Sequence, residues 1–407
     1  MPAIRWVLSR LTEDYLLLAL LLLLPLLLWL QPTALFDVAA LVDWHTVTAL
    51  AGLMLLSRAL EDSGYLARFA AWLLPRCHSE RLLALLLLLF AALLSAIVTN
   101  DVALFILLPI TLSIGRLTGL PVGRLIIFLA LAVNAGSALT PIGNPQNLLL
   151  WQASGYSFWQ FTLMMAPLAL SLLLLILLLS SLAFGSHKLS IAVPHNNSAD
   201  NRRLFIWSLA GYPLFILAME YQLAPYAALG LVAAYCALKR SVVTGIDWLL
   251  LLVFMLMFID LGLLAQLPLM QQLATQLMAL PNGSYTGSAL LSQLISNVPA
   301  AIFLQHFTHD WRALSWGVSV GGVTRWVALG PLIIQPAMMF VPLMAAHQYA
   351  DASHDALAFM AFVVFSLTAS SVYLLNDLVD VQDDRHHARK RHRPFASGAL
   401  SLIMGWA

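Results

Sequence analysis

The feature that most constrains this chain is a series of long apolar runs, the first of which extends from Tyr15 to Leu30 and is mostly leucine. A helix needs roughly 20 apolar residues to cross the hydrocarbon of a bilayer. Further runs of this scale lie at about 38–57, 81–113, 125–150, 161–184, 204–219, 224–238, 247–266, 286–306, 326–346 and 356–375. Such lengths indicate helices rather than the short alternating strands of a membrane barrel. We therefore predict an all-α polytopic membrane protein.

The composition excludes several classes of protein. Of the 407 residues, 61% are hydrophobic and only 10% are charged, whereas a soluble domain is about 45–50% apolar and about 25% charged. A water-soluble enzyme, a nucleic-acid-binding protein and a disordered chain are therefore excluded. The net charge of +1 gives no information about partners. The lipid bilayer is the expected partner, with no nucleic acid.

The positions of basic residues predict the orientation of the spans. Arg5 and Arg10 precede the first span, and the second span is followed by Arg58, Arg68, Arg76 and Arg81. Because cytoplasmic loops are enriched in Lys and Arg, we expect a cytoplasmic amino terminus.

Two apolar segments contain a polar break and are expected to be re-entrant hairpins. Segment 81–113 has basic residues at both ends and the break Thr99-Asn100-Asp101 near its middle, so it would enter from the cytoplasm. Segment 286–306 has the break Ser296-Asn297-Val298-Pro299 and no Lys or Arg near its ends, so it would enter from outside. Hairpins of opposite orientation are typical of inverted-repeat transporters.

Residues 134–147, NAGSALTPIGNPQN, form the most polar stretch inside an apolar span. Proline removes helix hydrogen bonds and glycine permits unwinding, so we expect a broken helix here. The N-termini of half-helices attract anions, and the side-chain oxygens of Ser, Thr and Asn can coordinate Na⁺. Asp101 is costly in the membrane unless it is protonated or paired with a cation. The alternative is that these polar residues only hold helices together; we favour ligand binding.

The motifs VTNDVALFILLPITL, NAGSALTPIGNPQNLLLW and SQLISNVPAAIFL resemble the arsenite-permease/citrate-transporter superfamily of ion transporters. The similarity covers about residues 1–322 and is greatest to anion permeases of the bacterial inner membrane. It implies secondary active transport of a small anion, coupled to Na⁺ or H⁺, around two hairpin tips and two unwound helices. It also suggests a homodimer. The resemblance gives most of the candidates for binding the substrate and the ion, and the polar stretch adds Asn134. The full set is Thr99, Asn100, Asp101, Asn134, Ser137, Thr140, Gly143, Asn144, Asn147, Ser296 and Asn297.

The sequence departs from this family after the second hairpin. A second unwound helix should follow there, but Val323-Thr324-Arg325-Trp326 interrupts the pattern. The apolar stretch 313–324 would be about 18 Å long as a helix, too short to cross the bilayer. We therefore expect a truncated second repeat and impaired transport.

A different motif follows the last apolar run. Asp377, Asp380 and Asp384 recur at spacings of three and four and would share one helix face. Clustered carboxylates suit Mg²⁺ bridging a diphosphate, and phosphate oxygens could contact the basic residues Arg385, Arg389, Lys390, Arg391 and Arg393. The alternative to a phosphate site is a cytoplasmic loop of mixed charge. For the basic run alone this alternative is favoured, and for the spaced aspartates it is not.

The stretch NDLVDVQDDRHHARKRHRPFASGAL resembles the first aspartate motif of UbiA-type prenyltransferases, in particular their polyprenyl-phosphate phosphoribosyltransferase-like branch. The similarity covers about residues 326–407. It implies two helices of a UbiA-like bundle, with Asp377, Asp380 and Asp384 as catalytic Mg²⁺ ligands. We therefore expect a transporter domain at 1–322 and a truncated prenyltransferase-like segment at 323–407. A transporter is favoured; the alternatives are a Mg²⁺-dependent prenyl or polyprenyl-phosphate transferase fragment and a non-functional gene fusion.

Overall fold

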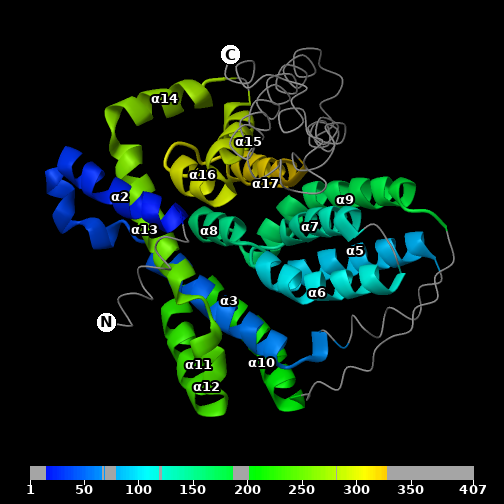
Figure 1. The fold of residues 1–407 in the computed structure, drawn as a ribbon. Helices are drawn as coiled ribbons and strands as arrows, with labels where there is room; N and C mark the ends of the chain where they lie inside the picture. Colours follow the sequence, from blue (N-terminus) through cyan, green and yellow to red (C-terminus); the bar gives the residue numbers. More distant parts are fainter. Residues whose placement is uncertain are drawn as a thin grey trace, which may run out of the picture. The chain divides into compact units, whose positions relative to one another are not determined.

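The computed structural model describes residues 15–66, 68, 79–118, 122–186, 201–280 and 282–327, and the regular elements in this part of the chain are all helical (Figure 1). The chain divides into two compact units, Met1–Val323 and Thr324–Ala407. The expected span 356–375, most of 326–346 and the aspartate motif with its basic run lie outside the described residues.

Several helices have the length and composition of membrane spans. Among the described residues, four are long and apolar enough to cross a bilayer: α5 (Glu80–Ile97), α9 (Phe158–Ala183), α10 (Arg202–Glu220) and α13 (Trp248–Gln266). Shorter apolar helices are α2 (Tyr15–Leu30), α6 (Asn100–Thr118), α7 (Val122–Ser137) and α11 (Ala224–Leu238). The prediction of an all-α, multi-pass membrane protein is confirmed.

The second span begins later than the expected residue 38. Two 3-10 helices, η1 (Pro32–Phe36) and η2 (Val38–Ala40), precede α3 (Trp44–Asp62). The boundary lies here because Asp43 caps α3: its Oδ1 accepts the Thr46 N–H at 3.1 Å and its Oδ2 accepts the Thr46 hydroxyl at 2.6 Å. The indole Nε1 of Trp44 donates to the Ala39 carbonyl at 3.1 Å, which fixes the approach to the helix.

Helix α7 packs closely against α5 (Figure 1). At Gly136 a Cβ atom would lie 2.1 Å from the Ala92 carbonyl oxygen, so only glycine permits this approach. One turn away, the Ser95 hydroxyl donates to the Val133 carbonyl at 2.8 Å. These contacts hold the end of α7 in a fixed position beside α5.

Helices α10 and α11 pack against α3, and buried hydroxyl pairs join the three helices. Ser57 on α3 lies 2.6 Å from the Tyr212 hydroxyl on α10, and Ser208 on α10 lies 2.9 Å from the Tyr235 hydroxyl on α11. Inside a membrane such pairs satisfy polar groups that lipid cannot.

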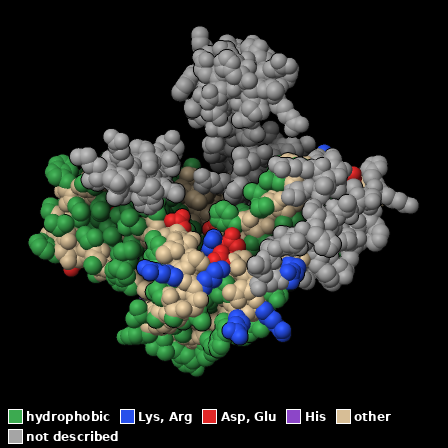
Figure 2. Space-filling model, turned by 60° about the horizontal axis from the view of Figure 1, so that its bottom comes forward, with side chains coloured by type: hydrophobic (Ala, Val, Ile, Leu, Met, Phe, Trp, Pro, Cys, Tyr) green, Lys and Arg blue, Asp and Glu red, His purple; other side chains and the backbone are tan. Residues whose placement is uncertain are grey.

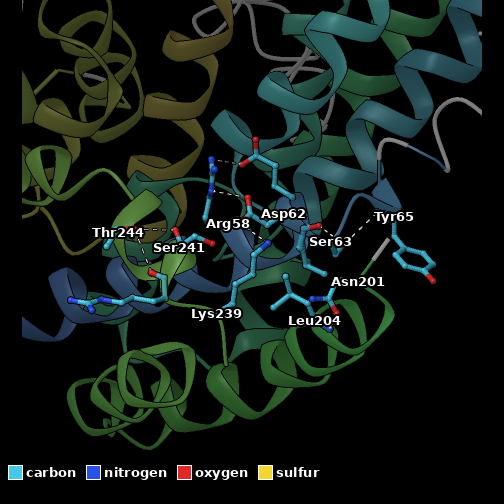
Figure 3. A network of polar contacts seen from close by, with 12 residues as sticks. Arg58, Asp62, Ser63, Tyr65, Asn201, Leu204, Lys239, Ser241 and Thr244 are labelled. Carbon is cyan, nitrogen blue, oxygen red and sulfur yellow. Dashed lines mark hydrogen bonds and ion pairs between the residues drawn. The ribbon is translucent and has the colours of Figure 1, made fainter. Parts of the chain in front are cut away.

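A charged cluster lies at the carboxyl end of α3, where α11 leads into α12 (Arg240–Gly245). Asp62 accepts ion pairs from Arg58 and Lys239, each at 3.1 Å. Figure 3 shows the three side chains converging, and Figure 2 shows charged side chains gathered on one face among hydrophobic ones.

The second half of the described chain begins with α13 and continues through α14 (Pro268–Met278), α15 (Gly283–Ile295), α16 (Asn297–Leu304) and α17 (Trp311–Val327). Helix α17 has 17 residues, so the expectation of a segment confined to 313–324 is wrong. Residues 323–327 continue the helix because they include neither proline nor glycine. At a rise of 1.5 Å per residue α17 is about 25 Å long, close to the thickness of the hydrocarbon.

Candidate functional site

The first hairpin tip lies where the sequence predicted it. Helix α5 ends at Ile97, Val98 is extended, and α6 begins at Asn100. The backbone N–H of Asn100 donates to the Gly143 carbonyl at 2.9 Å, which joins this tip to the break between α7 and α8. Thr99 is buried, and the side-chain oxygen Oδ1 of Asn100 is buried without a hydrogen-bond partner in the described part of the chain. The tip therefore presents an unused acceptor.

The predicted unwound segment is residues 138–144, between the end of α7 at Ser137 and the start of α8 (Pro145–Ser154). Asn144 caps α8, because its Oδ1 accepts the Asn147 N–H at 2.8 Å. The Nδ2 of Asn144 reaches back and donates to the Ser137 carbonyl at 3.0 Å. One buried amide thus closes the ends of both half-helices.

Asn147 and Thr140 hold the unwound backbone in place. The Nδ2 of Asn147 donates to the carbonyls of Ala138 at 3.0 Å and Thr140 at 3.1 Å, and the Thr140 hydroxyl donates to the Ala96 carbonyl at 2.7 Å. These bonds use only the amide nitrogen of Asn147. Its oxygen, Oδ1, is fully buried and has no hydrogen-bond partner among the described residues. Asn147 therefore combines a bracing role with a free acceptor.

The remaining first-repeat candidates differ in what the structure leaves available. Asn134 and Ser137 make bonds within the last turns of α7, through Asn134 Nδ2 to the Ala130 carbonyl and Ser137 Oγ to the Asn134 carbonyl. Gly143 is required for packing, since a Cβ there would lie 2.2 Å from the Ser137 carbonyl oxygen. Asp101 is in the first turn of α6, and its side chain is exposed.

The second tip is a single residue between α15 and α16. Ser296 has a φ of 83°, a conformation that is uncommon and strained for a residue with a Cβ atom. Its hydroxyl donates to the Oδ1 of Asn297, the first residue of α16, at 3.0 Å. Helix α17 approaches this tip at Gly322, where a Cβ would lie 2.9 Å from the Asn297 Nδ2.

The two tips belong to one packed group of helices. Helix α16 packs against α8 and α13, and the first tip is bonded to the segment that precedes α8. Helix α6 begins at the first tip, α8 begins at the end of the unwound segment, and α16 begins at the second tip. A helix N-terminus carries a partial positive charge and attracts anions. Within the described residues this arrangement combines anion-attracting N–H groups with the neutral acceptors of Asn100 and Asn147.

The family model described as "Citrate transporter" matches residues 4–321 of the chain. The chain belongs to this family. A second model, the UbiA prenyltransferase family, matches residues 333–407. Both resemblances drawn from the motifs are thereby confirmed, and the chain is a multi-pass membrane transporter of the anion-permease type over most of its length.

Similar proteins carry transporter or membrane-protein names. Inner membrane protein YbiR of Escherichia coli (strain K12) is 45% identical over 285 residues, which cover 70% of this chain and 76% of that protein. An uncharacterized transporter of Methanocaldococcus jannaschii is 31% identical over 289 residues, covering 70% and 78%. An uncharacterized transporter of Mycobacterium bovis is 23% identical over 320 residues, covering 69% and 75%.

One buried polar residue was missed at the level of the sequence. Asp260 lies in α13 with no exposed surface, and neither carboxyl oxygen has a hydrogen-bond partner among the described residues. The signal was available, because Asp260 is the one charged residue in an otherwise apolar helix of 19 residues. The site residues predicted at 377–393 lie outside the described residues.

Proposed function

We propose that the protein moves a small anion across the bacterial inner membrane by secondary active transport, with its amino terminus in the cytoplasm and with Na⁺ or H⁺ as the coupling ion. The observation that supports this most directly is a pair of buried oxygens, those of Asn100 and Asn147, which have no hydrogen-bond partner among the described residues and lie near the N-termini of α6 and α8. The N–H groups suit the anion, and the amide oxygens suit a cation or a protonated group.

Alternating access requires two equivalent halves, and the two halves share local geometry that supports an inverted repeat. Helices α3 and α13 each have 19 residues and begin with Trp after an Asp that caps the helix. In each, the indole of that tryptophan donates to a carbonyl five residues earlier, Trp44 to Ala39 at 3.1 Å and Trp248 to Val243 at 3.0 Å. A fold of this kind transports by moving one group of helices against the other.

The packing before each tip is also alike. Ser95 donates to the Ala92 carbonyl at 3.0 Å on α5, and Ser292 donates to the Ala289 carbonyl at 2.9 Å on α15. The helix that faces each of these serine turns carries a glycine for which there is no room for a Cβ atom. Gly136 on α7 faces Ala92, and a Cβ added at Gly321 on α17 would lie 2.7 Å from the Ala289 carbonyl oxygen. These contacts support equating α5 and α7 with α15 and α17.

Uptake by proteoliposomes that contain the purified full chain tests this function. Radiolabelled citrate, succinate, phosphate and arsenite would be offered separately under an inward Na⁺ gradient and under an inward H⁺ gradient. We expect one anion to accumulate, and Asn100→Ala and Asn147→Ala each to abolish the accumulation because each removes a free acceptor. Gln272→Ala is the control, since it truncates an amide side chain that is exposed on α14, away from the tips, and should transport normally.

Accumulation unchanged by Asn100→Ala and Asn147→Ala would contradict the proposed site. No accumulation of any anion under either gradient would contradict transport by this chain, and would agree with the impaired second repeat or the non-functional fusion. The homodimer expected from the resemblance stays a prediction.

The match of residues 333–407 to the UbiA family favours a second candidate function, Mg²⁺-dependent transfer from a polyprenyl diphosphate or phosphate. Asp377, Asp380 and Asp384 would hold the Mg²⁺, and the basic residues at 385–393 would contact phosphate. Incubation of the full chain with labelled polyprenyl donors and Mg²⁺ tests this. Transfer lost in Asp380→Ala would support it, and no transfer from any donor would contradict it.

A further inference from the structure

Asp260 is a carboxyl group in the interior of a membrane helix. It is the thirteenth of the 19 residues of α13, about 18 Å from the start of the helix and about 9 Å from its end. Its side chain has no exposed surface, and both oxygens lack hydrogen-bond partners among the described residues. An ionised carboxylate in such a place is expensive, and ionisable residues inside membrane helices usually serve transport.

No basic group near Asp260 offsets this cost in the described part of the chain. Helix α13 packs against α2, α3, α14 and α16, and of these only α3 carries charged or histidine side chains. Helices α3 and α13 run antiparallel, because Leu41 before α3 contacts Gly262 and Arg58 near the end of α3 contacts Gly245 before α13. Asp260 lies about 18 Å beyond the start of α13, so Arg58 is at the opposite end of the helix from it.

The acidic and titratable groups at the near end of α3 are also accounted for. Asp37 and His45 are exposed, and Asp43 is occupied by the backbone and hydroxyl of Thr46. Of the described charges on α3, Glu61 and Asp62 lie with Arg58 in the ion pairs at the far end. Among the described residues, Asp260 thus has neither a counter-ion nor a competing acid beside it.

Helix α13 is linked to the proposed binding site through α16. It packs against α16, the helix that starts at the second tip, and α16 packs against α8. One helix, α16, therefore connects α13 to the segment that holds the first tip.

We propose that Asp260 is the site that binds the coupling proton. The proposal rests on the proposed transport function and selects H⁺ as the coupling ion. In each cycle the carboxylate takes one proton from water on one side of the membrane and forms an O–H bond. The neutral acid is buried in the conformation seen here, and the proton returns to water when α13 is exposed to the other side. The charged form cannot be buried without a large cost, so the conformational step requires the proton.

The first test detects the proton directly and does not require a known substrate. Infrared difference spectra of the purified full chain in lipid would be recorded between about pH 6, at which carboxyl groups of ordinary pKa are already ionised, and alkaline pH. We expect a carbonyl band of a protonated carboxylic acid that disappears at alkaline pH, is missing in Asp260→Asn and is shifted in Asp260→Glu.

The matched control for this test is Asp247→Asn. Asp247 is exposed and caps the same helix, its Oδ1 accepting the N–H groups of Leu249 and Leu250 at 3.1 Å, and asparagine also caps helices well. This variant should keep the band unchanged. A band that persists in Asp260→Asn, or the lack of any such band in the wild type, would overturn the proposal.

The second test separates coupling from binding. With the anion found by the uptake screen, Asp260→Asn should lose accumulation driven by a pH gradient and retain exchange of labelled for unlabelled anion, since the amide imitates the protonated acid. Asp260→Glu should restore part of the accumulation. Accumulation by Asp260→Asn equal to that of the wild type would overturn the proposal. If the wild type transports nothing, the proposed transport function fails, and the infrared test alone decides whether Asp260 binds a proton.

Discussion

Replacing Gly136 by alanine should separate α7 from α5 and displace the unwound segment that follows. The added Cβ would lie 2.1 Å from the carbonyl oxygen of Ala92 and 2.5 Å from its Cα. Both are backbone atoms of the neighbouring helix α5. Ordinary van der Waals contact begins near 3.4 Å, so the oxygen contact alone must lengthen by about 1.3 Å. Backbone cannot rotate away as a side chain can, so the two helices must move apart.

The expected cost is about 3 kcal/mol, the upper end of the usual 1–3 kcal/mol for overpacking a core. Gly123→Ala on the same helix is the matched control, because a Cβ at Gly123 meets nothing within 4 Å. That change should stabilise the protein by up to about 1 kcal/mol, since alanine favours a helix over glycine.

Thermal unfolding of the purified variants in detergent, followed by tryptophan fluorescence, measures both effects. We expect a lower midpoint for Gly136→Ala and an equal or higher midpoint for Gly123→Ala. Because Gly136 lies one residue before the end of α7, Gly136→Ala should also weaken anion binding more than Gly123→Ala does. Equal midpoints for the two variants would refute the inference that the α5–α7 contact has no room for a methyl group.

Three further changes test the bonds around the site and its support. Asn147→Ala should lower stability by about 1–3 kcal/mol, because it leaves two buried carbonyls unpaired, and unfolding by denaturant measures it. Ser57→Ala and Tyr212→Phe should show a coupling of about 0.6–1.7 kcal/mol in a double-mutant cycle; no coupling would contradict their hydrogen bond. Asp62→Asn should cost at most about 1 kcal/mol, because the side chain of its partner Lys239 is 33% exposed, and the loss should shrink with added salt.

The sequence alone was sufficient to predict where the helices are interrupted. The break before α8 coincides with residues that end one helix and begin the next, because Asn144 caps α8 and Pro145 occupies its first position. The start of α3 was missed because its position depends on the side chain of Asp43, which caps Trp44 onward, and hydropathy does not register capping. The length of α17 was missed because Thr324 and Arg325 looked like an interruption, although neither residue breaks a helix.

The roles of the polar candidates could not be read from residue type. Asn144 and Asn147 looked equally suited to a ligand. In the structure, however, the amide nitrogen of each donates to backbone carbonyls, and only the Oδ1 of Asn147 is left without a partner among the described residues, since the Oδ1 of Asn144 accepts the Asn147 N–H. Whether an amide braces the backbone or faces a ligand depends on where the unwound carbonyls point. That direction follows from the packing of α5, α7 and α8 together, which a single segment of sequence does not contain.

The proposed equivalence of α3 and α13 allows Asp260 to be compared with the residue at the same position in the first half. If the caps Asp43 and Asp247 correspond, Asp260 corresponds to Leu56, whose side chain packs against Gly211 of α10. The next residue on α3 is Ser57, hydrogen-bonded to α10, so in the first half this face of the helix is fixed to its neighbour. In the second half the same position carries a carboxyl group with no partner among the described residues. Two halves of equal geometry would be expected to move alike. If Asp260 binds the coupling proton as proposed, α3 would be the stationary element of the pair and α13 the element whose burial depends on a proton.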